Sequence, residues 1–305
     1  SKQFINTIIK RVVHYGLLSF FTLLVLYPNI KHIISYKIPT VFTKNEVIVL
    51  DKLKNIANRE DYVISWWDYG YPIKYYSNVK TLIDGGKHSG VVNFSTSFIL
   101  TSPQEDASKM ARLDVEYTEM RFNATDSNLT LAASNIEQMT LDYGYDNTND
   151  FLYALETELV LPKKTRDIYL YLPQRLLNIL PTVDLFSNID LMTGKQGHRP
   201  FFYQTTDIQQ ENGKIDLGSG VFILKDKAEI QIANQRVKIK DFVITQYDQN
   251  GKLYKNFQSL NKDGDLSVIY MKNYNTFLVL DNKLYSSTYI QLFVLENYDS
   301  DLFEP

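Results

Sequence analysis

The sequence contains no cysteine and only four histidines among its 305 residues. Without cysteine, the chain has no disulfide scaffold, no thiolate zinc site, no thiolate-bound iron–sulfur cluster and no cysteine nucleophile. The histidines are scattered, with no pair four residues apart and no HExxH motif. The sequence therefore gives no support for a zinc hydrolase.

Neither sign of charge dominates the chain. Lys and Arg number 32 and Asp and Glu number 35, which gives a formal net charge of −3. Because binding to a nucleic acid depends on many cationic contacts to phosphates, no nucleic-acid partner is expected. The motifs GxGxxG and GxSxG are also absent, so dinucleotide-binding and α/β-hydrolase folds lack support. Aromatic residues are abundant, with 22 Tyr and 17 Phe, and this composition suits binding clefts and interfaces.

A long apolar run, VVHYGLLSFFTLLVLY, spans Val12–Tyr27. As an α-helix it would extend over roughly 24 Å, or about 28 Å if it continued to Ile30, close to the thickness of a membrane core. Lys10 and Arg11 precede it, which favours a cytoplasmic location for that end. We predict a transmembrane helix. One alternative is a signal peptide, but no small-x-small cleavage site follows the apolar run. The other alternative is a buried helix of a soluble protein.

The first residue is Ser1 rather than Met, so we expect a fragment or a processed chain. Residues 1–30 are then expected to hold the last transmembrane helix of a membrane domain that this sequence does not include. The chain from about Lys31 onward would lie on the outer side of that membrane.

Residues 31–184 alternate helical patterns with short apolar strands. Tyr62–Trp66 and Ile168–Leu172 are the strand candidates, and Pro103–Phe122 predicts a long helix that starts with proline. Asn45 is expected to cap an earlier helix. Strands that alternate with helices predict a mixed α/β core, rich in helix, with a mostly parallel sheet.

Residues 185–285 have a different pattern of short alternating runs. These runs are separated by Asn212-Gly213, Asn250-Gly251 and Asp263-Gly264, and such dipeptides are the strongest short hairpin signals. We predict a β-rich, barrel-like module here. Residues 286–305 return to a helical pattern, so the module is predicted to be inserted into the α/β core, with a C-terminal helix that returns to that core.

Both tryptophans of the chain lie side by side in the motif Trp66-Trp67-Asp68-Tyr69-Gly70, at the end of the first predicted strand. Open α/β sheets tend to bind ligands at the carboxyl ends of their strands. Two indole N–H donors and one carboxylate acceptor can surround a hydroxyl group. From the residues alone, a second interpretation stays open, in which the tryptophans belong to the core and Asp68 caps the next helix.

The motif and its surroundings resemble the catalytic subunits of oligosaccharyltransferases, in particular the bacterial single-subunit enzymes. The resemblance covers nearly the whole chain and continues in Tyr71–Ser77, Asp84–His88, Val115–Glu119, Thr165–Tyr171 and Asn297–Asp299. It identifies the chain as the C-terminal periplasmic portion of such an enzyme. The implied reaction transfers an oligosaccharide from undecaprenyl diphosphate to the Asn of an Asp/Glu-x-Asn-x-Ser/Thr sequon.

The resemblance also implies roles for particular residues. Trp66, Trp67 and Asp68 would bind the hydroxyl of the acceptor Ser or Thr, with Tyr69 and Gly70 in support. A site that binds a hydroxyl with buried polar groups rejects an analogue without it, because those groups are left unpaired.

Bacterial members of the family carry a helix motif of Met-x-x-Ile, followed four residues later by Ile, Val or Trp. Its candidate here is Leu176-x-x-Ile179-x-x-x-Val183, in which Leu176 replaces Met at similar volume. Ile179 would contact the methyl group of an acceptor Thr. One buried methyl is worth roughly 1 kcal/mol, so the preference for Thr over Ser should be modest. The alternative is that these residues, with Leu180, form a core stripe.

In this family the acidic residues that bind Mg²⁺ or Mn²⁺ belong to the membrane domain and its outer loops. The resemblance thus implies no catalytic residue and no metal ligand in this sequence, which by itself would recognise acceptors without transferring glycan. The implied partners are an acceptor polypeptide, an undecaprenyl-diphosphate-linked oligosaccharide and the membrane. We expect a monomer in the inner membrane, with this portion in the periplasm.

Two further expectations concern modification and function class. Asp126-Ser127-Asn128-Leu129-Thr130 itself satisfies the acceptor pattern, so Asn128 is a candidate autoglycosylation site. The alternative function is a noncatalytic periplasmic module that binds peptides or glycans through its aromatic residues and β strands. A polytopic membrane region encoded upstream would favour the enzyme.

Overall fold

The computed structural model describes residues 2–36, 42–124, 133–157, 159–211 and 213–305. The chain divides into two compact units, residues 1–47 and 48–305, which are described separately.

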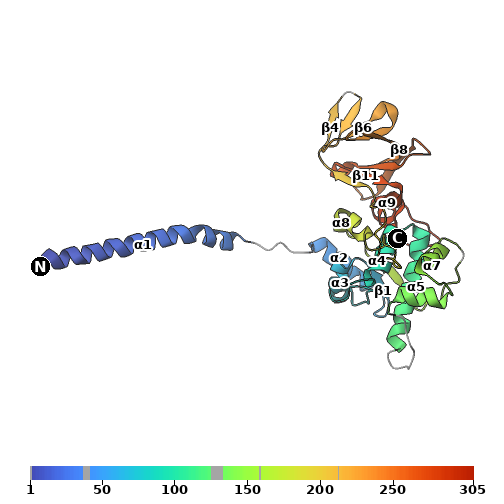
Figure 1. The fold of residues 1–305 in the computed structure, drawn as a ribbon, viewed down its shortest axis with the longest axis horizontal. Coiled ribbons are helices and arrows are strands. Elements are labelled where there is room, and N and C mark those ends of the chain that lie inside the picture. Colours follow the sequence, from blue (N-terminus) through green and yellow to red (C-terminus); the bar gives the residue numbers. More distant parts are fainter. Residues whose placement is uncertain (1, 37–41, 125–132, 158, 212) are drawn as a thin grey trace. The chain divides into compact units, whose positions relative to one another are not determined.

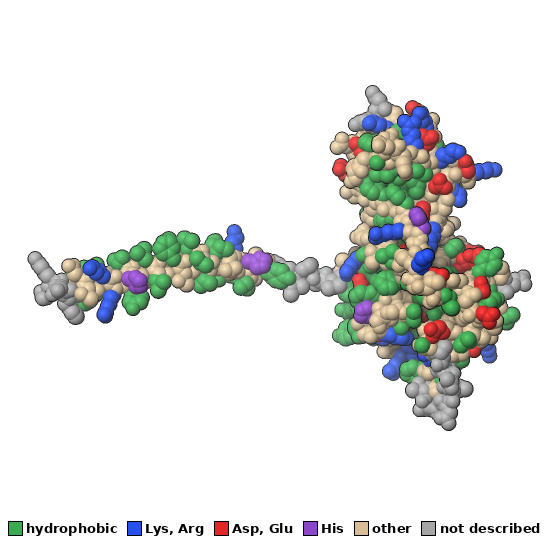
Figure 2. Space-filling model, viewed as in Figure 1, with side chains coloured by type: hydrophobic (Ala, Val, Ile, Leu, Met, Phe, Trp, Pro, Cys, Tyr) green, Lys and Arg blue, Asp and Glu red, His purple; other side chains and the backbone are tan. Residues whose placement is uncertain are grey.

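The first unit consists mainly of helix α1 (Lys2–Ser35). Its stretch Ile5–Ser35 has 31 residues and a mean hydropathy of 1.5, and Figure 2 shows hydrophobic side chains along it. Among the described helices, α1 is long and apolar enough to cross a membrane. The helix is longer than the predicted apolar run, and Pro28 lies inside it.

Helix α2 (Lys44–Leu53) begins with a capping box, a reciprocal pair of hydrogen bonds at a helix start. The Thr43 backbone N–H donates to Glu46 Oε2 at 2.7 Å, and the Glu46 N–H donates to Thr43 Oγ1 at 3.3 Å. The prediction of Asn45 as the cap is therefore wrong. Thr43 has a glutamate three residues later that completes the box.

The second unit contains a helical core around two short parallel strands. Strand β1 (Tyr62–Ile64) pairs with β2 (Ile168–Leu170), and Lys80 adds a parallel bridge to Tyr62. Both strands are shorter than predicted. Figure 1 shows the helices grouped near β1. These are η1 (Trp67–Tyr69), α3 (Gly70–Ser77), α4 (Val92–Thr101), α5 (Gln104–Ala124), α6 (Asn135–Asp142), α7 (Thr148–Leu155) and α8 (Arg175–Asp184). The prediction of a mixed, helix-rich α/β core is confirmed.

A nine-stranded sheet forms the β module. Its strands are β3 (Phe202–Thr205), β4 (Gln209–Glu211), β5 (Lys214–Asp216), β6 (Val221–Leu224), β7 (Glu229–Ile232), β8 (Gln235–Tyr247), β9 (Leu253–Ser259), β10 (Leu266–Met271) and β11 (Thr276–Asp281). The order is β3-β11-β10-β8-β7-β6-β5-β4, with β9 also paired to β8. The 13-residue strand β8 bonds to β7, β9 and β10 and so joins the parts of the curled sheet. The prediction of a β-rich, barrel-like module is confirmed as a fold.

Two of the three predicted hairpins are present. Strands β4 and β5 are antiparallel, as are β8 and β9, with Gly213 and Gly251 at φ of +75° and +80°. Asn212 lies outside the described residues. The hairpin predicted at Asp263-Gly264 is wrong, because β9 pairs with β8 and β10 runs parallel to β8. A Cβ atom on Gly264 would lie 2.6 Å from Lys240 Cα, so glycine serves here for close backbone packing.

The C-terminal segment is less helical than predicted. Helix α9 (Asn282–Ser286) ends at Ser287, which has an extended ψ of 144°, and a π-helical turn follows at Ile290–Val294. Tyr289 Oη donates to the Pro173 carbonyl at 2.9 Å, and the Thr288 N–H donates to the Ser102 carbonyl at 2.8 Å. The prediction of one C-terminal helix is wrong, because bonds to distant segments replace the continuous helical bonds.

A buried carboxylate on α5, Glu119, is bonded to β1, the strand that precedes the tryptophan motif. Glu119, with a side chain 10% exposed, accepts hydrogen bonds from Tyr62 Oη at 2.6 Å, Lys80 Nζ at 2.8 Å and Arg166 Nη2 at 3.0 Å. Burial alone would raise the pKa of Glu119, but these three donors outweigh burial and lower the pKa to about 2. The network therefore contributes stability only while Glu119 is ionised.

We predict that Glu119→Gln lowers the free energy of unfolding by about 3 kcal/mol at pH 7, because three donors lose their charged partner. The ordinary pKa of 4.5 is lowered in the fold, so the contribution is full above that pH and is lost as the pH falls toward 2. Urea unfolding of the chain in detergent at pH 7 and pH 3 measures this, and the difference from wild type should be about half as large at pH 3. Glu105→Gln, on the same helix with a side chain 65% exposed, is the control. An equal loss for both variants, or a loss independent of pH, would contradict the prediction.

Candidate functional site

The tryptophan motif lies at the carboxyl end of β1. Trp66 is 3% exposed, whereas Trp67 and Asp68 are partly exposed on the 3₁₀ turn η1. Tyr69 is the N-cap of α3, and no side chain caps either helix start. Asp68 is therefore not a helix cap, so that part of the alternative interpretation is wrong, whereas Trp66 does lie in the buried core.

Aromatic contacts fix the rings of the motif. Trp66 packs against Phe186 with ring centroids 5.2 Å apart, and Trp67 stacks on His88 at 4.4 Å with an interplanar angle of 19°. Tyr69 is buried and packs edge-on against Tyr171. Stacked and edge-to-face contacts hold rings in defined orientations. The two indole N–H groups are thus carried by constrained side chains.

The segment Asp84–His88, called the glycine loop below, is bonded to helix α3, which begins at the last residue of the motif. Asp84 Oδ1 accepts the backbone N–H groups of Gly86 at 2.8 Å and Lys87 at 2.9 Å, and Oδ2 pairs with Lys74 of α3. Burial opposes ionisation of Asp84, but these bonds hold its pKa below the ordinary value. Asn93 Nδ2 donates to the His88 carbonyl at 2.6 Å. The loop is therefore a rigid support for the ring that stacks on Trp67.

Gly70 is where the glycine loop comes closest to the motif. A Cβ atom at this position would lie 2.5 Å from Asp84 Cα and 2.6 Å from the Ile83 carbonyl oxygen. Cβ atoms added to Gly85 and Gly86 would lie 2.8 Å and 2.6 Å from the Tyr71 ring and hydroxyl. Gly70 lets α3 pack against the backbone of the glycine loop, whereas Gly85 and Gly86 leave room for the Tyr71 side chain, so Gly70 supports the motif through packing.

Helix α8 supplies the partner of Asp68. Arg175 Nη2 lies 3.7 Å from Asp68 Oδ2, and their side chains are 52% and 19% exposed. Ile179 follows four residues later and is half-buried. Residues four apart share one face of a helix, so Arg175 and Ile179 lie on the same side of α8. Leu176 is fully buried, so it acts through packing.

The far end of α8 is also anchored. Asp184 is fully buried and lies 2.7 Å from Lys283 Nζ of α9, and Ser97 Oγ donates to the Val183 carbonyl at 2.6 Å. A buried carboxylate with a cationic partner resists displacement, because losing the partner would leave the charge unpaired. Sequence reasoning missed the contact of Arg175 with Asp68 and that of His88 with Trp67. The four-residue spacing of Arg175 and Ile179 could have indicated that Arg175 lies on the same helix face as Ile179.

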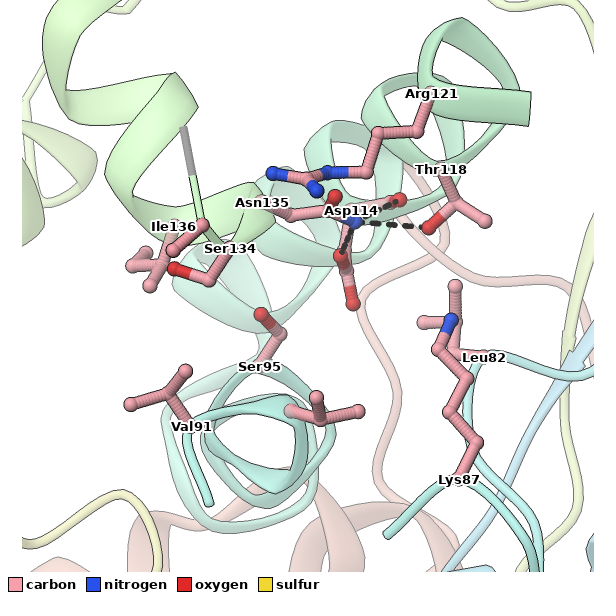
Figure 3. Close-up of a pocket in the computed structure, with 12 residues that line it drawn as sticks. Leu82, Lys87, Val91, Ser95, Asp114, Thr118, Arg121, Ser134, Asn135 and Ile136 are labelled. Carbon is pink, nitrogen blue, oxygen red and sulfur yellow. Dashed lines mark hydrogen bonds between the residues drawn. The ribbon is translucent and has the colours of Figure 1, made fainter. Parts of the chain in front are cut away.

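A cavity of about 240 Å³ borders the glycine loop at Lys87 (Figure 3). Lys87, Asp114 and Arg121 line it, and neither the tryptophan motif nor Ile179 does. Burial raises the pKa of Asp114, whose Oδ1 accepts a hydrogen bond from Asn135 Nδ2 at 2.6 Å. Successive loop residues thus face different places, with Lys87 at the cavity and His88 at Trp67. The candidate site is the surface of the motif rather than the cavity.

Two remaining expectations concern a modification site and metal ligands. Asn128 lies outside the described residues, so its autoglycosylation stays a prediction. Among the described residues, no group of three or more His, Asp or Glu side chains could hold a metal ion.

Comparisons with known proteins identify the family. Residues 59–193 match the STT3/PglB/AglB core domain, and residues 201–280 match the STT3/PglB C-terminal beta-barrel domain. The crystal structure of the Campylobacter jejuni PglB C-terminal domain is similar, with a TM-score of 0.71 and 37% identity, over 85% of this chain and 94% of that one. This chain belongs to the STT3/PglB family.

Two curated relatives are longer than this chain. Both are the undecaprenyl-diphosphooligosaccharide–protein glycotransferase of Campylobacter jejuni, one from strain RM1221 and one from subspecies jejuni serotype O:2. Each is 42% identical to this chain over 293 residues, which cover 93% of the chain. The chain spans 40% of the length of each relative.

We predict that Gly70→Ala lowers the free energy of unfolding by about 3 kcal/mol, because the added methyl group overlaps backbone atoms that cannot move aside cheaply. Thermal unfolding of the chain in detergent measures the loss. Gly16→Ala is the matched control, since a Cβ atom there would meet nothing within 4 Å. If Gly70→Ala were as stable as Gly16→Ala, the prediction would be wrong, because the glycine loop would then move aside to make room for the methyl group.

Proposed function

We propose that this chain is the acceptor-recognition part of an oligosaccharyltransferase. The reaction moves an oligosaccharide from undecaprenyl diphosphate to the Asn of an Asp/Glu-x-Asn-x-Ser/Thr sequon. One observation supports this most strongly: a partly exposed Asp68 lies beside two constrained indoles, in a chain 42% identical to a Campylobacter jejuni glycotransferase.

The chemistry of the motif suits a hydroxyl group. A Ser or Thr hydroxyl donates one hydrogen bond and accepts others, so Asp68 can accept the hydrogen bond that the hydroxyl donates, while the N–H groups of Trp66 and Trp67 donate to the hydroxyl oxygen. Asp68 caps no helix and is partly exposed, so its carboxylate is available for this role. In this proposal Asp68 binds the acceptor and is not the base of the transfer reaction.

Ile179 is proposed to contact the methyl group of an acceptor Thr. It shares a face of α8 with Arg175, which pairs with Asp68, so Ile179 lies one helical turn from the partner of the hydroxyl-binding carboxylate. Its half-buried state leaves apolar surface for a methyl contact.

The divalent ion of the proposed reaction, Mg²⁺ or Mn²⁺, has no group of ligands among the described residues. We assign its ligands to a part of the enzyme outside this sequence. The contribution of this chain is then to bind the sequon and hold the acceptor Asn in place.

We propose that α1 crosses the inner membrane and that the rest of the chain lies in the periplasm, as a monomer. The proposed divisions are residues 31–184 for the core, which take in the end of α1 at Ser35, residues 185–285 for an inserted β module, and residues 286–305 for the return to the core. The contacts of Thr288 and Tyr289 with Ser102 and Pro173 support this insertion.

We predict that Asp68→Ala lowers transfer to an Asp-x-Asn-x-Thr peptide on the order of a hundredfold, because the hydroxyl loses a charged acceptor. The assay uses the protein expressed from its complete reading frame, with lipid-linked donor and Mn²⁺. Asp51→Ala changes an exposed carboxylate on α2 and is the control. Full transfer by Asp68→Ala would make the motif structural. Peptide binding without any transfer by the wild type would favour a noncatalytic binding module.

A separate prediction concerns Ile179. The wild type should prefer Thr over Ser acceptors about fivefold in kcat/KM, the value of roughly one buried methyl. Ile179→Ala should bring this ratio close to one, since the methyl contact is lost. The exposed neighbour Asn178 provides the control variant Asn178→Ala. An unchanged Thr-to-Ser ratio in Ile179→Ala would remove the contact from the proposal.

A further inference from the structure

Arg175 is the cation that pairs with Asp68 in the described part of the chain. The distance of 3.7 Å between Arg175 Nη2 and Asp68 Oδ2 exceeds that of a hydrogen bond, so the two groups form a charge pair without a closed bond. Asp68 Oδ2 therefore faces the guanidinium. The other oxygen, Oδ1, is the one left for a ligand.

The location of Arg175 is unfavourable for the helix that carries it. Arg175 is the first residue of α8, and the first turn of this helix contains no acidic residue. A cation at a helix N-terminus opposes the helix dipole, so helix stability gives no reason for arginine there. Gln174, the N-cap, makes no side-chain capping bond either. The observed partner, Asp68, supplies the reason.

Contacts at both ends of α8 fix the backbone position of Arg175. Tyr289 Oη donates to the Pro173 carbonyl at 2.9 Å, two residues before Arg175, and the buried Asp184–Lys283 pair anchors the other end of α8. The backbone of Arg175 is thus anchored on both sides. A carboxylate has a broad, roughly two-fold preference about its terminal torsion, so a charged neighbour selects its orientation.

We propose that Arg175 is a positioning residue for recognition of the acceptor hydroxyl. Its guanidinium holds Asp68 Oδ2, which turns Oδ1 toward the Ser or Thr hydroxyl between the two tryptophans. This inference rests on the proposed function. Arg175 itself acts through Asp68, whereas Ile179 on the same helix face contacts the acceptor methyl group.

A double-mutant cycle of Arg175→Ala and Asp68→Ala tests the proposal. The complete protein is assayed for transfer to an Asp-x-Asn-x-Thr peptide, with the lipid-linked donor in excess. Arg175→Ala should lower kcat/KM about threefold to fivefold, the scale of a partly exposed ion pair, mainly through a higher KM for the peptide. In the Asp68→Ala background the same change should have no further effect, because the group on which Arg175 acts is gone.

Two further variants separate positioning from a general structural effect. Arg175→Lys keeps the charge without the planar fork and should recover part of the lost kcat/KM. Arg199→Ala removes an exposed arginine outside α8 and should leave the KM for the peptide unchanged. The KM for the lipid-linked donor should be the same in Arg175→Ala as in the wild type, whereas a disturbed fold would change both constants.

The outcomes distinguish the two proposals. If Asp68→Ala transfers normally, the proposed function fails, and the role of Arg175 fails with it. If Asp68→Ala is impaired but Arg175→Ala is normal, only the role of Arg175 is overturned. The same holds if the two losses multiply in the double variant, because Arg175 would then act independently of Asp68.

Discussion

Helix α3 and the glycine loop approach each other so closely that only glycine fits at position 70. The approach brings Lys74 to the buried Asp84, whose other oxygen accepts two backbone N–H groups of the loop. The loop in turn carries His88, which stacks on Trp67. The close approach at Gly70 is thus connected, through Asp84 and the glycine loop, to the ring that stacks on an indole of the motif.

The candidate site is assembled from segments that are far apart in the chain. The motif follows β1, and Arg175 and Ile179 come from α8 more than a hundred residues later. The parallel pairing of β1 with β2 brings these segments together, since α8 follows β2 as η1 follows β1. Glu119 secures that arrangement, because its donors come from β1, from Lys80 and from Arg166 just before β2.

The β module reaches the site through α9. This helix continues directly from β11 (Figure 1), and its Lys283 pairs with the buried Asp184 at the end of α8. The following residues, Thr288 and Tyr289, bond to Ser102 and Pro173 of the core. A helix that carries candidate specificity residues is thus held in part by the end of the inserted sheet. This gives the module a structural role in addition to any surface it offers.

Local patterns in the sequence determined the long helix α5, the first strand, the hairpin at Asn250-Gly251 and the tryptophan motif, because periodicity and turn chemistry act between near neighbours. The tertiary structure decided the rest. The parallel pairing of β8 with β10 removed the hairpin expected at Asp263-Gly264, and bonds to Ser102 and Pro173 broke the expected C-terminal helix. The stacking of His88 on Trp67 and the pairing of Arg175 with Asp68 also join distant segments. Such contacts follow from how the elements pack, which no local pattern records.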